Sequence, residues 1–149
     1  MPTAVATAKG YQLAVLKGDG AGPEVFTPVC IINTSRGIMS GSRVIETVVP
    51  FCGTDADEPA WVERAVDELS RNIDGDGVLD TASLLLMNTW YESGQPSNVR
   101  MVLIANTLDG YWGGSAVLPN FEVAGSTRKE NLTFKCSIMS NGIFKWTDA

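Results

Sequence analysis

The chain has 149 residues, a formal net charge of −6 and no histidine. This length supports one hydrophobic core, so we expect a single domain over residues 1–149. The acidic charge argues against a protein that grips nucleic acid by its phosphates. The absence of histidine removes the commonest general base and metal ligand. No stretch has the apolar length of a bilayer span, so we expect no membrane association and synthesis in the cytoplasm.

The cysteine content predicts reduced thiols. Cys30, Cys52 and Cys136 are odd in number and show no C-x-x-C spacing. A disulfide framework and a zinc site are both disfavoured by this pattern. We therefore expect no cofactor to be held by these residues.

The first third of the chain predicts a flexible start followed by β structure. Residues 1–10 show no apolar periodicity, and residues 17–23 form a glycine-dense turn. Residues 35–42 (SRGIMSGS) are polar and interrupted by glycine, which predicts a connecting loop. The predicted strands are residues 11–16, 25–32 and 43–49.

The segment after Pro59 has two interpretations. Apolar residues recur at helical spacing over residues 59–69, with Pro59 at the first helical position. Alternation of polar with apolar or glycine residues over 69–79 instead predicts a strand. We favour a short irregular piece around Trp61 followed by a strand over residues 67–79.

Residues 81–93 carry the clearest helix pattern, with Asp80 as N-cap and Gly94 at the left-handed C′ position. The apolar side chains cover a wider arc than a surface helix needs. We therefore expect a helix that is buried on most sides, or one that lies between its own sheet and another chain. The two apolar faces are Ala82, Leu85, Leu86 and Trp90 on one side, and Leu84, Met87 and Tyr91 on the other.

The strand that precedes this helix partly matches a calcium-binding loop. Asn72, Asp74, Asp76 and Gly77 fit the D-x-[DN]-x-[DN]-G spacing, but Ser83 occupies the twelfth position, where a bidentate glutamate is needed. A turn or bulged strand that leads into the helix cap is the alternative. An enzyme would need a carboxylate pair such as Asp74 and Asp76, and without a supporting partner we predict no catalysis.

The rest of the chain predicts further strands, at residues 99–105, 111–117, 120–124 and 131–140. An Asn141-Gly142 turn then leads into the apolar residues Ile143, Phe144 and Trp146. Strands, one helix and strands again predict a mainly β fold. We expect a sandwich or barrel of two antiparallel sheets with the single helix 81–93 packed on it.

Several short patterns occur in an order that resembles the major tail tube proteins of long-tailed, siphophage-like bacteriophages and related gene transfer agents. The patterns are YQLAVLKGDGAGPEVFTPV, the tryptophan at Trp61, IDGDGVLDTASLLL, VRMVLI, GYWGGSAVLPNFEVAG and ENLTFKCSIMSNG. They cover most of the chain from about residue 11 onward. The resemblance implies a structural subunit of the virion tail that forms stacked homo-hexameric rings.

In such a tube, DNA would pass through the lumen without specific binding. The acidic composition suits a lumen that repels phosphate. The resemblance also implies tape measure, tail terminator and baseplate proteins as partners. Residues 35–42 and 51–60 become candidate assembly loops, with solvated connections as the alternative. Leu84, Met87 and Tyr91 become the candidate subunit interface.

A monomeric β-sandwich that binds a small molecule or glycan is the competing interpretation. It would use Trp90, Tyr91, Tyr111 and Trp112 as contact residues. These aromatics also have spacing compatible with core packing. Rings or tubes in a purified sample would favour the first interpretation, and a stable monomer would favour the second.

Overall fold

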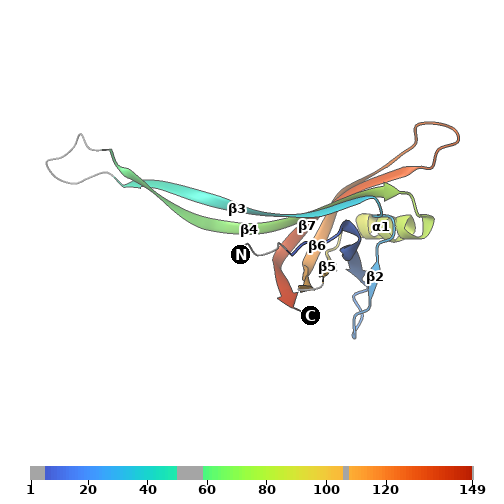
Figure 1. Cartoon of the computed structure of the whole chain (residues 1–149), viewed down its shortest axis with the longest axis horizontal. Coiled ribbons are helices and arrows are strands. Elements are labelled where there is room, and N and C mark those ends of the chain that lie inside the picture. Colours follow the sequence, from blue (N-terminus) through green and yellow to red (C-terminus); the bar gives the residue numbers. More distant parts are fainter. Residues whose placement is uncertain (1–5, 50–58, 106–107, 149) are drawn as a thin grey trace, which may run out of the picture.

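The computed structural model of the chain describes residues 6–49, 59–105 and 108–148 (Figure 1). Apart from a short 3₁₀ turn, η1 (Gly10–Gln12), this part of the chain forms strands and one helix. No helix among these residues is long and apolar enough to cross a membrane. The elements are β1 (Leu13–Gly18), β2 (Phe26–Pro28), β3 (Ser35–Val49), β4 (Trp61–Val78), α1 (Thr81–Ser93), β5 (Ser97–Ile104), β6 (Asp109–Ala124) and β7 (Thr133–Asp148).

All seven strands belong to one antiparallel sheet, in the order β2-β1-β5-β6-β7-β4-β3. The mainly β class with one packed helix is confirmed, but the strands form one sheet in place of the two expected. The reason is that β6 and β7, sixteen residues each, are long enough to contribute to two layers that pack on each other. Register shifts in β6 near Gly114 and near residues 117–120 let the pair bend from one layer into the other.

We call the two layers the body layer and the arm layer. The body layer contains β2, β1 and β5 with the first half of β6 and the second half of β7. The arm layer contains β3 and β4 with the first half of β7 and the second half of β6. In Figure 1, β3 and β4 continue together as a two-stranded ribbon well beyond the body.

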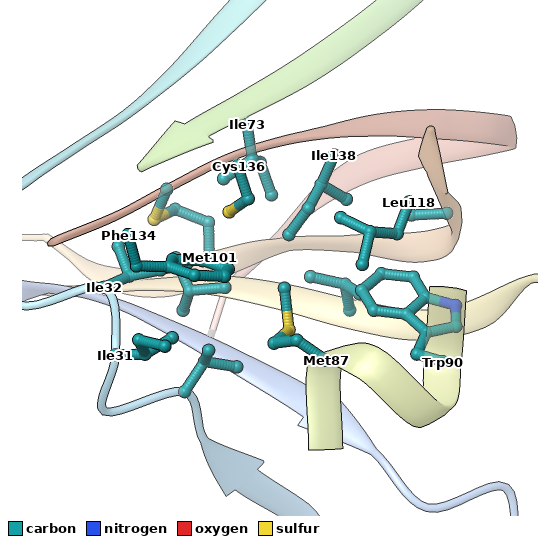
Figure 2. Close-up of a cluster of buried hydrophobic side chains, with 14 residues drawn as sticks. Ile31, Ile32, Ile73, Met87, Trp90, Met101, Leu118, Phe134, Cys136 and Ile138 are labelled. Atoms are coloured by element: carbon teal, nitrogen blue, oxygen red, sulfur yellow. The ribbon is translucent and has the colours of Figure 1, made fainter. Parts of the chain in front are cut away.

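The core lies between the two layers, and α1 covers one side of it. Figure 2 shows Met87 and Trp90 of the helix pointing into the same cluster as Met101 of β5, Phe134 of β7 and Ile73 of β4. All five side chains are at most 5% exposed. The other members of the core are Val15, Val29, Ile31, Ile32, Val99, Ala116, Leu118, Cys136 and Ile138.

The helix forms as its local signals predict. The Asp80 carboxylate accepts hydrogen bonds from the Ser83 backbone N–H (3.3 Å) and the Ser83 hydroxyl (2.8 Å). Gly94 ends the helix in the left-handed region at φ 65°. Trp90 is anchored in the core, and its Nε1–H donates to the Gln95 carbonyl at 3.0 Å. These contacts define both ends of the helix.

The predicted strand over residues 67–79 is confirmed, but the alternative helix over 59–69 and the irregular piece around Trp61 are wrong, because β4 begins at Trp61 and runs without a break to Val78. A register shift opposite Arg43/Val44 leaves one extra residue, Asp67, in β4. The extra residue returns Leu69 to the face that Val62 and Val66 occupy. Spacings of four and three on one face of a bulged strand imitate a helical period.

Three other boundaries differ from the sequence expectations. The predicted loop 35–42 is the first half of β3, because pairing with β4 along its length overrides weak local strand propensity. Residues 29–32 leave the predicted strand and form a turn, since their apolar side chains fill the core. The first strand begins at Leu13 after η1, and β6 and β7 each continue through the breaks expected at residues 118–119 and 141–142.

Candidate assembly surfaces

The most unusual surface is the outer part of the β3–β4 ribbon, which we call the arm: residues 44–49 of β3 and 61–66 of β4. Every residue of the arm is exposed, and Trp61 is 80% exposed. A two-stranded ribbon alone is marginally stable in water. Its uncovered large apolar side chains are Val44, Ile45, Val48, Val49, Trp61, Val62 and Val66. The arm therefore has the character of an interface that its own subunit does not cover.

Ion pairs in the arm and at its base hold β3 and β4 to each other without covering the apolar side chains of the arm. Arg64 contacts Glu46 at 3.0 Å, and Arg43 lies 3.7 Å from Asp67 and 3.4 Å from Glu68. All these side chains are strongly exposed, so each pair contributes roughly 0–1 kcal/mol. The arm thus needs further support from outside the subunit.

The arm layer also has two open edges. β3 pairs with β4 on one side only, over fifteen residues. At the opposite side of the layer, the second half of β6 pairs with β7 alone, because β5 pairs with β6 only as far as Ala116. Among the described residues, no other strand covers either edge. Long open edges of this kind are templates for pairing with another chain.

The face of the arm layer that points away from the core is bare and acidic. Asp74 and Asp76 of β4 lie beside Ser137 and Lys135 of β7, and Glu122 of β6 pairs with the same lysine. Three carboxylates and one ammonium therefore share this face, which alternation along each strand separates from the apolar core face. We call it the bare face.

The bare face contains both residues of the weak calcium candidate. Asp74 and Asp76 sit two residues apart in a regular strand, where they line one face and do not wrap around a common point. In the described part of the chain, no group of three or more His, Cys, Asp or Glu residues could hold a metal ion. The residues of the partial calcium motif lie along β4, which leads into the helix cap at Asp80.

The helix residues named as a subunit interface occupy different environments. Met87 is fully buried in its own subunit, and Leu84 packs at the margin of the same core. Tyr91 is half exposed and lies edge-to-face against Phe121 of β6, with ring centroids 5.5 Å apart. The most exposed large apolar residue on α1 is Leu85, at 69%. The core thus takes up Met87, Trp90 and Leu84, while part of the helix's wide apolar arc stays exposed.

The aromatic residues of the binding-module interpretation do not share a surface. Trp90 is buried in the core. Tyr111 and Trp112 are neighbours in β6 and point to opposite faces. Tyr111 stacks with Arg100, and Trp112 packs against Trp146 with centroids 4.8 Å apart. The four side chains therefore form no common aromatic platform.

Sequence reasoning missed the arm as a functional element. The sequence predicts a strand at residues 43–49, but the bulge at Asp67 obscures its partner strand. The candidate loop 51–60 lies outside the described residues except for Pro59 and Ala60. The signal that could have revealed the arm is the run of β-branched residues in 44–49, followed after an acidic stretch of sequence by Val62 and Val66.

Comparisons with known proteins agree with this architecture. No protein-family model matches the sequence, and no curated protein matches it. A chain from the tail of an empty gene transfer agent particle, refined with C6 symmetry, superposes with a TM-score of 0.73 at 18% identity, over 95% of this chain and 99% of that chain.

Two further solved structures are similar. The SPP1 tail tube chain has a TM-score of 0.65 at 12% identity, over 96% of this chain and 80% of that chain. A chain of the anti-feeding prophage baseplate, six-fold symmetrised, has a TM-score of 0.61 at 13% identity, over 99% and 98%. Because these identities are low, the similarity establishes the fold. The chain has the fold of phage-type tail tube proteins.

Proposed function

We propose that the chain is a structural, non-catalytic subunit of a phage-type tail tube in a virion tail, made in the host cytoplasm. The observation that carries the proposal is the fifteen-residue open edge of β3, the outer part of which lies on an arm that its own subunit leaves uncovered. Soluble proteins cover or shorten such edges unless another chain pairs with them. The tail fold supplies the context in which that other chain is a second copy.

Ring closure would join the two open edges of the arm layer. In the strand order β3, β4, β7, β6, each strand runs opposite to its neighbour. If β3 of one copy lies beside β6 of the next copy, the combined sheet therefore stays antiparallel. This contact uses different surfaces on the two partners, and a rotation that closes makes a ring. The C6 symmetry of the gene transfer agent tail supports six copies for this chain.

The bare face would line the lumen. The core, the body layer and α1 all lie on the face of the arm layer opposite to the bare face. They occupy more space than the side chains of the bare face do. Because the circumference of a ring grows with its radius, the face that carries them would lie on the outside of the ring. The carboxylates Asp74, Asp76 and Glu122 would then repel the phosphates of passing DNA and bind none of its bases.

The proposal includes the tail partners that the resemblance implies. Rings would stack into a tube that contacts a tape measure protein, a tail terminator and baseplate proteins. The similarity to a baseplate chain supports contacts at that end of the tube. Leu84 and Tyr91 remain candidates for contacts between neighbours in the ring, whereas Met87 is taken up by the core.

Negative-stain electron microscopy and sedimentation velocity of the purified protein over a wide concentration range test the proposal. We expect rings or tubes whose fraction rises with concentration. A protein that stays monomeric at high concentration, with no particles on the grid, would contradict the proposed function.

A further inference from the structure

The outer face of the body layer, which points away from the core, carries an arginine held between aromatic rings. Val99 and Met101 of β5 point into the core, so Arg100 between them points outward by strand alternation. Its guanidinium carbon lies 3.8 Å from the ring centroid of Phe26 in β2 and 4.3 Å from that of Tyr111 in β6. At these distances both rings attract the cation, and together they restrict where the guanidinium can lie.

A glycine makes room for this arrangement. Gly113 of β6 lies directly opposite Arg100 in β5. A Cβ at Gly113 would lie 2.9 Å from the ring of Tyr111 and 3.3 Å from Cγ of Arg100. The Tyr111 ring therefore lies over the glycine and reaches the arginine beside it. A side chain at this position would have to displace the ring.

The guanidinium of Arg100 has no anionic partner of its own. In the described part of the chain no carboxylate forms an ion pair with it. Glu24 borders this face, but its two oxygens accept hydrogen bonds from the Asn98 side-chain amide at 2.9 Å and from the Gly20 N–H at 3.0 Å. A guanidinium with rings against its faces keeps its N–H donors at its edge, where a carboxylate can pair with it through two hydrogen bonds.

The neighbours of Arg100 on the outer face are a second cation and neutral polar groups. Exposed Lys145 of β7 lies opposite Gly113, two strands away from Arg100, so their Cα atoms are about 10 Å apart. Ser115 lies in the adjacent cross-strand row on one side, and Thr147 lies in the adjacent row on the other. None of the residues paired in these three rows carries a carboxylate. This part of an acidic protein therefore offers an anion two positive charges and several hydrogen-bonding groups.

Charge complementarity and the hydroxyl groups favour one class of occupant. Tyr111, Ser115 and Thr147 have hydroxyls that both donate and accept, as the hydroxyls of a sugar require. The guanidinium already lies against the two rings, which leaves them poorly placed to stack on nucleic-acid bases, and two cations neutralise few phosphates. A sugar chain that carries carboxylates matches both the cations and the hydroxyls.

We propose that the outer face of the body layer binds an acidic glycan. A uronate carboxylate pairs with Arg100, and the sugar hydroxyls meet Tyr111, Ser115 and Thr147. The inference goes beyond the proposed tail function, because the whole site lies within one copy of the chain. In the proposed tube the body layer faces outward, so the site would repeat around the outer surface. Repeated weak sites bind a polymer more tightly than one site does.

Calorimetric titration of the purified protein with oligogalacturonate at low salt tests the site. The methyl-esterified oligomer of the same length is the uncharged control, and we expect it not to bind. Arg100→Gln should weaken binding of the acidic oligomer by about tenfold or more, because the bidentate pair is lost. Arg100→Lys keeps the charge but loses the fork, and should weaken binding nearly as much. Arg128→Gln removes the same charge from the exposed loop between β6 and β7, and this matched control should bind as the wild type does.

Gly113→Ala is a second variant that keeps every charge. It should displace the Tyr111 ring from Arg100 and weaken binding, while thermal unfolding checks that the fold is retained. Equal affinities of Arg100→Gln and Arg128→Gln, or equal binding of the acidic and esterified oligomers, would overturn the site. Tighter binding of single-stranded DNA with the same number of charges would overturn the choice of a glycan. Absence of rings in the wild-type protein contradicts the proposed tail function and leaves this titration unchanged, so the two failures are distinguishable.

Discussion

At the residue scale, glycines on the core face of β4 make room for the turn at residues 29–32. A Cβ on Gly77 would lie 2.4 Å from the Ile31 carbonyl oxygen, and a Cβ on Gly37 would meet nothing within 4 Å. Both glycines have strand conformation. We expect Gly77→Ala to lower the free energy of unfolding by about 1–3 kcal/mol through overpacking, with Gly37→Ala neutral. Equal urea midpoints for the two variants would refute this account of the turn.

Cys136 and Cys30 should differ in reactivity. Burial, helped by the charge of Asp74, raises the pKa of the Cys136 thiol to about 12 from its ordinary 9.0, while Cys30 is exposed. Cys136 therefore stays protonated in the folded protein at pH 8. Its stabilisation is complete below about pH 9 and is lost as the pH rises toward 12. Iodoacetamide at pH 8 followed by peptide mass spectrometry should label Cys30 and spare Cys136 until the protein is unfolded. Equal labelling of both thiols in the native protein would exclude a buried neutral thiol.

At the element scale, α1 depends on its cap. Asp80→Ala removes the acceptor for Ser83 and should cost about 1 kcal/mol, whereas Asp80→Asn keeps an acceptor and should cost less. Thermal or urea unfolding of the three proteins measures the difference. If the two substitutions lower stability equally, the carboxylate's contribution is charge and not capping.

An element could be predicted when the residues that determine it are close together in the sequence, and not when it depends on pairing with a distant strand. The helix 81–93 was predictable because Asp80 and Gly94 are local caps. The start of β4 at Trp61 was not, because its apolar spacing reflects the bulge at Asp67. The strand at residues 35–42 depends on a partner at residues 69–76, far away in the sequence, and local composition carries no trace of that pairing. The wide apolar arc of the helix predicts a neighbouring chain, and the core covers only part of that arc, whereas the arm is exposed along its whole length.

At the scale of the whole molecule, the charge of the bare face tests the hypothesis that this face lines the lumen of the tube. Asp74→Lys with Glu122→Lys reverses two exposed charges on this face. Tubes should still form, and they should retain short duplex DNA at low salt and release it at high salt. Glu92→Lys with Glu130→Lys makes the same change in net charge on α1 and in the loop between β6 and β7, and should retain far less. Equal retention by both variants in a co-sedimentation assay would argue that the bare face lies outside the lumen.

A cryo-electron microscopy reconstruction of the assembled protein tests the central claim most directly. The account predicts a six-fold ring in which β3 of each copy is hydrogen-bonded to the second half of β6 of the next. Asp74, Asp76 and Glu122 should face the channel, and α1 should lie outside it. A ring joined through the body layer, or one with the bare face on the outer surface, would contradict the account.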